Sequence, residues 1–150
     1  MSNKSTGTKF EREFAALLAE HWFWVHLFQD NKNGQPCDVI AARNGTTYLF
    51  DCKACSEDRF FMSRMRENQY NAMELFRITG NGRGMMAIRF PGGEIYLLDY
   101  LVLKSLVGDG VKRIGKDKMT QYARPLNNWL EELEGPGCLE DRDDADCDWK

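Results

Sequence analysis

The chain has 150 residues and a mass of 17.4 kDa, the size of a single domain with one hydrophobic core. Its 43% hydrophobic and 29% charged residues exclude a disordered or collagen-like chain. The amino terminus has no hydrophobic signal segment and no apolar run is long enough to span a membrane. Since the five cysteines are an odd number without an export signal, we expect a cytoplasmic protein with reduced thiols.

The net charge of -3 is unevenly distributed along the chain. Residues 131–150 carry nine acids against two bases, which leaves residues 1–130 with a charge of +4. The acidic total therefore does not exclude a polyanionic partner for the body of the protein. We predict one domain over residues 1–134 and an acidic, disordered tail over residues 135–150.

The first half of the chain predicts one helix and three strands. Apolar residues recur at helical spacing from Thr8 to His21, and the aromatic stretch from Trp22 to Phe28 indicates a strand. Turn-forming residues follow at 30–36. Asn44-Gly45 is a strong hairpin signal because both residues tolerate positive φ. The predicted strands of this hairpin are Val39–Ala42 and Thr46–Ala54.

The second half predicts three more helices and a second hairpin. Asp99 can cap one of these helices, and Pro125 can open the last. The predicted elements are a helix at about Ser63–Arg77, strands Met85–Arg89 and Ile95–Leu98, and helices Tyr100–Leu106 and 126–134. The polar and basic stretch Gly108–Arg124 is predicted to connect the last two. The fold class is α+β: a central mixed sheet flanked by helices.

Two acidic residues and a lysine are expected to meet at one end of the first hairpin. Asp51 and Lys53 are two residues apart in a strand, so their side chains share one face of the sheet. If Asn44-Gly45 turns the chain back, Asp38 at the start of one strand lies near both. Converging carboxylates suit Mg²⁺, which leaves some of its coordination positions to water and substrate phosphate. Such a site would support metal-assisted phosphodiester hydrolysis, in which the lysine orients or deprotonates the attacking water. The alternative is a surface hairpin with an incidental Asp-Lys pair, which the D-x-K spacing alone does not exclude.

Helical spacing adds further candidates to this site. Gln69 falls inside the apolar stripe of the second predicted helix, where an unpartnered amide costs of order 1–3 kcal/mol. A metal-bound water, a site carboxylate or a backbone group would each satisfy it. In the first helix Glu11 and Glu13 both border the apolar stripe, and spacing does not choose between them.

The order of these residues resembles the PD-(D/E)XK nuclease superfamily. The shared pattern is Gly7-x-x-Phe-Glu11 on a first helix, then Pro36-x-Asp38, a hairpin, Asp51-x-Lys53, and Asn68-Gln69 on a second helix. The chain looks most like Holliday junction resolvases of the RecU type, with the archaeal resolvases close behind. The resemblance implies a restriction-endonuclease-like core with metal ligands Glu11, Asp38 and Asp51, catalytic Lys53, and Gln69 in the site. Asp51 departs from the commoner glutamate at its position.

This resemblance implies a Mg²⁺-dependent endonuclease, with Mn²⁺ as a substitute metal, that acts as a homodimer on four-way DNA junctions in recombination and repair. It would be a cytoplasmic protein of a bacterium or a phage. Phe60 and Phe61 could contact DNA or belong to the core. Basic residues that follow the site strand, or lie in the later basic stretch, are candidate phosphate contacts. They are Arg64, Arg66, Lys112, Arg113, Lys116 and Lys118.

Two alternatives compete with the junction nuclease. A nuclease of the same superfamily could act on other DNA structures. A zinc site would instead make the protein a non-catalytic nucleic-acid-binding module, because Cys52 and Cys55 have C-x-x-C spacing and Cys138 and Cys147 could complete four ligands. Strand geometry disfavours this zinc site, since residues 52 and 55 face opposite sides of an extended strand. His21 and His26 are predicted to be structural.

Overall fold

The computed structural model describes residues 3–28, 35, 37–82 and 84–134. Its centre is a six-stranded sheet in the order β1-β2-β3-β5-β6-β8, and β4 and β7 form a separate pair. Only β3 and β5 are parallel neighbours, so the large sheet is mixed, as predicted. The strands of the large sheet are β1 Trp24–Leu27, β2 Val39–Arg43, β3 Thr46–Ala54, β5 Met85–Arg89, β6 Ile95–Asp99 and β8 Arg124–Pro125.

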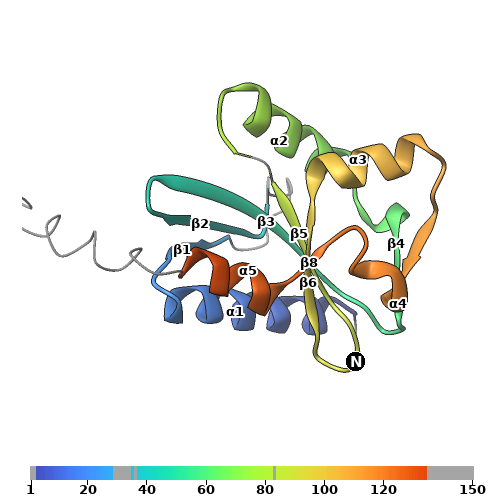
Figure 1. Cartoon of the computed structure of the whole chain (residues 1–150), viewed down its shortest axis with the longest axis horizontal. Coiled ribbons are helices and arrows are strands. Elements are labelled where there is room, and N and C mark those ends of the chain that lie inside the picture. The colour runs from blue at the N-terminus through green and yellow to red at the C-terminus, as the bar shows by residue number, and fades with distance from the viewer. Residues whose placement is uncertain (1–2, 29–34, 36, 83, 135–150) are drawn as a thin grey trace, which may run out of the picture.

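Helices cover both faces of the large sheet (Figure 1). The helices α1 and α5 lie on one face, and α2 and α3 on the other. The helix bounds are α1 Asn3–Glu20, α2 Glu67–Ile78, α3 Tyr100–Gly108, α4 Lys116–Met119 and α5 Leu126–Leu133. This arrangement confirms the α+β class with helices flanking a mixed sheet.

Each face of the sheet has its own hydrophobic cluster. Phe14 of α1 packs with Phe50 of β3 and Trp129 of α5 on the first face. On the second face Met73 of α2 belongs to the same cluster as Ile88 of β5. Since alternate strand residues enter opposite clusters, the cluster membership shows which way each strand side chain points.

The first hairpin forms as predicted. Asn44 and Gly45 have φ values of 52° and 80°, which suit the tight turn between β2 and β3. The predicted α3 also forms, and its N-cap Asp99 accepts a hydrogen bond from the Leu101 N–H at 2.8 Å. The predicted strand at Trp22–Phe28 is shorter, because Trp22 lies in a turn with φ of 69°.

Two predictions are corrected in the second half of the chain. The helix predicted from Ser63 begins at Glu67, since β4 Arg59–Phe61 and a 3-10 turn at Met62–Arg64 precede it. β4 pairs with β7 Arg113–Gly115, inside the stretch predicted to be a plain connection. Sequence-distant pairing of two three-residue strands produces no periodicity that a local pattern could show.

None of the described helices combines the length and apolar composition that a membrane span requires. The predicted acidic tail at 135–150 and most of the predicted loop at 30–36 lie outside the described residues.

Candidate active site

The hairpin register brings Asp38 and Asp51 together. Val39 pairs with Phe50, and the Asp38 N–H donates to the Phe50 carbonyl at 3.0 Å, so the next residues on each strand, Asp38 and Asp51, lie opposite one another. The positive φ angles at the Asn44-Gly45 turn fix this register, because the loop length determines which residues face each other. The two carboxylates therefore meet at one end of the hairpin, where the sequence predicts them.

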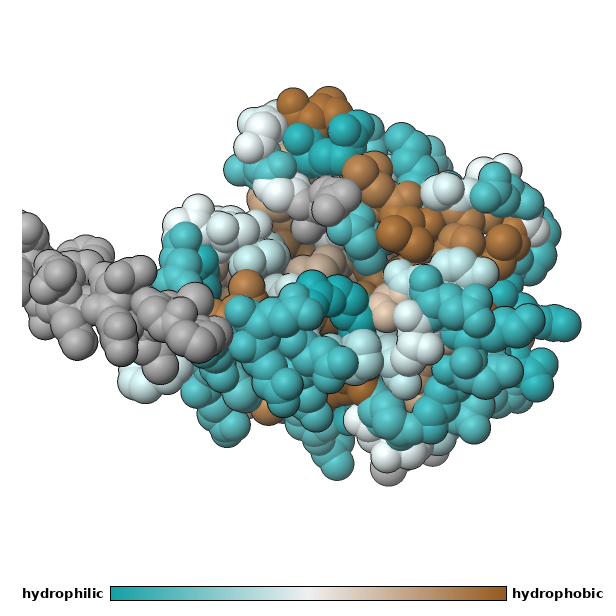
Figure 2. All heavy atoms as spheres, in the orientation of Figure 1, coloured by the Kyte–Doolittle hydropathy of each residue, from teal (hydrophilic) through white to brown (hydrophobic). Residues whose placement is uncertain are grey.

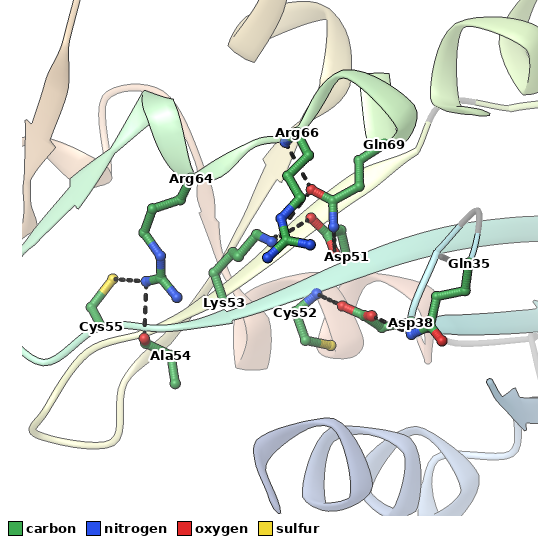
Figure 3. A network of polar contacts seen from close by, with 10 residues as sticks. All are labelled: Gln35, Asp38, Asp51, Cys52, Lys53, Ala54, Cys55, Arg64, Arg66 and Gln69. Carbon is green, nitrogen blue, oxygen red and sulfur yellow. Dashed lines mark hydrogen bonds and ion pairs between the residues drawn. The ribbon is translucent and has the colours of Figure 1, made fainter. Parts of the chain in front are cut away.

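Asp38 is held by hydrogen bonds to both of its oxygens (Figure 3). Its Oδ2 accepts from the Cys52 N–H at 2.7 Å, and its Oδ1 accepts from the Gln35 side-chain amide at 2.9 Å. The residue is 7% exposed. The contact from Gln35 was not predicted, because Gln35 belongs to a loop whose path no sequence pattern specifies.

Asp51, Lys53 and Gln69 form a compact group on the other side of β3 from α1 (Figure 3). Lys53 Nζ lies 3.2 Å from Asp51 Oδ2, and the Gln69 amide donates to Asp51 Oδ1 at 3.1 Å. Gln69 Oε1 accepts from Lys53 Nζ at 3.4 Å and from the Arg66 N–H at 3.0 Å. The inward direction predicted for Gln69 agrees with this geometry, and both the site carboxylate and a backbone group satisfy its amide.

Burial and charge make Asp51 a strong potential cation ligand. The residue is fully buried, and desolvation together with neighbouring Asp38 raises its pKa well above the usual value, while Lys53 opposes the shift. Its Oδ2 lies 3.2 Å from the Lys53 ammonium and accepts no other hydrogen bond among the described residues. One ammonium thus faces two carboxylates, and a cation would compensate the remaining negative charge.

The donor set fits a hard divalent ion. Mg²⁺ is commonly bound through one or two carboxylates and keeps its other positions for water and phosphate. Asp38 and Asp51 provide such a pair, and Asp51 Oδ2 is an acceptor without a donor. The described residues contain no ready group of three or more acidic, histidine or cysteine side chains for a metal. The three-carboxylate set with Glu11 is therefore not assembled, and a ligand role for Glu11 stays a prediction.

The structure separates the two glutamates of α1. Glu13 accepts a hydrogen bond from Arg89 Nη1 at 2.6 Å, so its carboxylate is engaged away from the aspartates. Glu11 lies close enough to β3 for its charge to help raise the pKa of the buried Cys52 thiol. Of the two, Glu11 is the one whose charge reaches the strand that carries Asp51.

The described cysteines do not make a zinc site. Zinc binds thiolates, and burial raises the pKa of the Cys37 thiol to about 12 and that of Cys52 well above its usual value. Neither these nor Cys55 enters a metal-binding cluster within the described part of the chain. Cys138 and Cys147 lie outside it.

The candidate phosphate contacts form two sets in the sequence, one at residues 64–66 and one at residues 112–118. The pairing of β4 with β7 brings these two sets together. Arg113 pairs with Phe61 across β4 and β7, and Arg64 follows three residues later, with Nη1 donating to the Ala54 carbonyl at 2.9 Å. Figure 3 shows the Arg66 side chain beside Lys53 and Gln69. Lys112 and Lys118 are exposed, whereas Lys116 is paired with Glu94.

The remaining predicted residues are divided between core and surface. Phe60 is buried in the second cluster and is a core residue, whereas Phe61 is exposed. His21 contacts Glu134, with 2.7 Å between Nδ1 and Oε1. His26, predicted to be structural, lies on the exposed face of β1 between Val25 and Leu27, which pack on the core, and its ring contacts that of Phe28.

Comparisons with known proteins agree with this fold. The family model described as archaeal Holliday junction resolvase (Hjc) matches residues 2–133. The chain belongs to this family. It is 30% identical over 96 residues to the crossover junction endodeoxyribonuclease Hjc of Methanocaldococcus jannaschii, an alignment that covers 64% of this chain and 68% of the relative.

A solved structure shares the architecture of this Hjc family member. The Holliday junction resolvase Hjc of Archaeoglobus fulgidus superposes with a TM-score of 0.64 at 16% sequence identity, over 83% of this chain and 99% of that one. The family lies within the PD-(D/E)XK superfamily, so the predicted resemblance is confirmed. The family model that matches is the archaeal one, and both relatives are archaeal, so the comparisons do not support the expected bacterial or phage source.

Proposed function

We propose that this protein is a divalent-metal-dependent endonuclease that resolves four-way DNA junctions by hydrolysing one phosphodiester in each of two equivalent strands. Membership of the archaeal Holliday junction resolvase family supports the reaction and the substrate class. The single observation that carries the site assignment is the group of Asp38, Asp51, Lys53 and Gln69 at one end of the β2–β3 hairpin. Mg²⁺ is the proposed ion, with Mn²⁺ able to replace it.

Each side chain has a separate task in the proposed reaction. Asp38 and Asp51 would hold the ion, and when bound the ion would supply polarisation of the phosphate and a lowered pKa for an attacking water. Lys53 would orient that water or move its proton, a role that its position 3.2 Å from Asp51 Oδ2 supports. Gln69 keeps Asp51 and Lys53 in position, since its amide contacts both.

A symmetric homodimer is part of the proposal. A four-way junction offers two equivalent strands, and a two-fold dimer would present one site to each. Phosphate contacts from exposed Arg66, Arg113, Lys112 and Lys118 would supply affinity that is independent of sequence. The protein would act in the cytoplasm.

The test compares the wild type with Asp51→Asn and Lys53→Ala on a four-way junction, a linear duplex and a flap, with Mg²⁺ and with a chelator. We expect the wild type to cleave the junction preferentially and only with metal. Each variant should lower the rate by roughly 100-fold or more, since acid–base and electrostatic contributions have this size.

The matched controls Asp109→Asn and Lys104→Ala change exposed residues of α3 and its C-cap and should cleave normally. Undiminished cleavage by both site variants would remove the assignment, and equal activity on plain duplex would indicate a nuclease for other DNA structures.

A further inference from the structure

Two large aromatic side chains are exposed at the edge of the sheet. Trp22 is 66% exposed and Trp24 is 64% exposed. Trp22 also has a φ of 69°, a conformation that bulky residues rarely adopt. β1, which begins at Trp24, is an edge strand of the six-stranded sheet. An indole that is two-thirds exposed gives up much of the burial that normally makes tryptophan stabilising, so these positions favour a binding role.

Trp24 shares its sheet face with the candidate active site. Val25 and Leu27 of β1 pack on the α1 cluster, so Trp24 and His26 point to the opposite face. Phe50 of β3 also belongs to the α1 cluster, and its neighbour Asp51 therefore points to that same opposite face. Strand alternation thus places Trp24, His26 and Asp51 on one face of the sheet across β1, β2 and β3.

The aromatic residues lead directly to the aspartates. The Phe28 N–H donates to the Asp38 carbonyl at 3.0 Å, which extends the β1–β2 pairing to the site. The rings of His26 and Phe28 lie 5.0 Å apart at 88°, so these two side chains lie on one side of the chain. Trp24, His26 and Phe28 therefore form a row along β1 that ends beside Asp38. Figure 1 shows the β1–β2 ribbon extending to one side of α2 and α3.

The row along β1 differs in chemistry from the exposed apolar side chains of α2 and α3. Figure 2 shows brown, hydrophobic atoms over α2 and α3, the helices on which the aliphatic residues Leu75, Ile78 and Val107 are exposed. The row along β1 is aromatic instead, and its neighbours on β2, Ile40 and Ala42, carry no charge. Aromatic rings suit stacking on nucleic acid bases better than aliphatic side chains do.

We propose that Trp24, continued by His26 and Phe28, is a stacking platform for unpaired bases of the DNA strand that enters the active site. This inference rests on the proposed junction-resolving function and names the feature of the substrate that is recognised. The rings of His26 and Phe28 are 5.0 Å apart and nearly perpendicular, whereas stacked bases are parallel and ~3.4 Å apart. The row therefore does not match a continuous base stack. It matches bases that have separated, as they can at the branch point of a junction.

The competing occupant of this surface is a second copy of the chain. The open edge of β1 could pair with another strand, and an exposed tryptophan would then be buried between protomers. Both possibilities concern the same residues, so the test includes the oligomeric state.

The test measures binding of the full-length protein to a four-way junction and to a linear duplex in the presence of a chelator, by fluorescence anisotropy. The variants are Trp24→Ala and Trp24→Phe, and the control is Leu75→Ala, which changes a residue of similar exposure, 59%, on α2. We expect Trp24→Ala to weaken junction binding by roughly 5-fold or more and to leave duplex binding unchanged. Trp24→Phe should restore most of the affinity, and Leu75→Ala should bind as the wild type does.

A fluorescent base in the junction measures stacking on Trp24 directly. 2-Aminopurine placed at the branch point should lose fluorescence when the wild type binds and keep it with Trp24→Ala, because stacking on the indole quenches it. Junction binding and quenching by Trp24→Ala equal to those of the wild type would overturn the platform. The platform would also be overturned if, without DNA, the wild type sedimented as a dimer and Trp24→Ala as a monomer. That result would identify an interface between two copies of the chain. Because these measurements need no cleavage, their failure is distinguishable from failure of the nuclease assignment.

Discussion

At the scale of single residues, Gln69 links the second helix to the site. Its Oε1 accepts the N–H of Arg66 at the N-cap of α2, and its amide donates to Asp51. The first contact is the helix-capping half of a capping box, and the second satisfies a buried carboxylate. One side chain therefore fixes the position of α2 relative to the strand that carries the aspartate and the lysine.

Replacement of Gln69 by alanine should affect both stability and activity. We expect the free energy of unfolding to fall by about 1 kcal/mol, because a helix cap is lost and Asp51 Oδ1 loses its donor. Cleavage should slow by more than the stability loss explains, since Lys53 also loses a partner. Urea denaturation and single-turnover cleavage measure the two effects. The neighbour Asn68 is exposed, and Asn68→Ala serves as the control. If Gln69→Ala cleaves at the wild-type rate, Gln69 is only a helix cap.

At the scale of elements, the β2–β3 hairpin holds the two aspartates opposite one another. Gly45 has φ of 80°, and a Cβ at this position would meet nothing within 4 Å. Alanine there is therefore penalised by backbone conformation and not by steric contact. The left-handed conformation costs a non-glycine residue of the order of 1–2 kcal/mol.

We predict that Gly45→Ala destabilises the fold by about 1 kcal/mol. The control is Gly108→Ala, because Gly108 also has open space around it and no positive φ, and it is the last residue of α3, where a helical backbone suits alanine. This control should be neutral or slightly stabilising. Thermal unfolding of the two variants under identical conditions measures the difference. Equal melting temperatures would contradict the assigned turn geometry.

The elements that sequence could predict are those specified by local signals. The Asn44-Gly45 turn determines a register, so Asp38 and Asp51 could be placed together without coordinates. The helical phase of Gln69 likewise predicted its direction. By contrast, the pairing of β4 with β7 depends on residues far apart in the chain, and neither strand has an alternating pattern long enough to detect. The contact from Gln35 to Asp38 and the aromatic row along β1 depend on how a loop and an edge strand meet.

At the scale of the whole molecule, the sheet separates two hydrophobic clusters and leaves the site at the end of one hairpin, on the α2 side. The candidate phosphate contacts lie directly before α2, at β7 and in α4. Nine of the 23 acids lie in residues 131–150, six of them between residues 140 and 148. Charge along the chain is thus divided between a basic body and an acidic carboxyl-terminal segment.

This division predicts that the acidic segment weakens DNA binding through charge alone. Changing the six acids at 140–148 to their amides would take the formal net charge from -3 to +3 without altering the chain length. We expect tighter binding of both junction and duplex at low salt, because fewer like charges oppose the phosphates. The gain should shrink as ionic strength rises, since the screening length falls from ~30 Å at 0.01 M to ~8 Å at 0.15 M salt. Binding isotherms at several salt concentrations measure the effect. A gain confined to the junction, or one that persists at high salt, would indicate a specific contact instead of a general electrostatic effect.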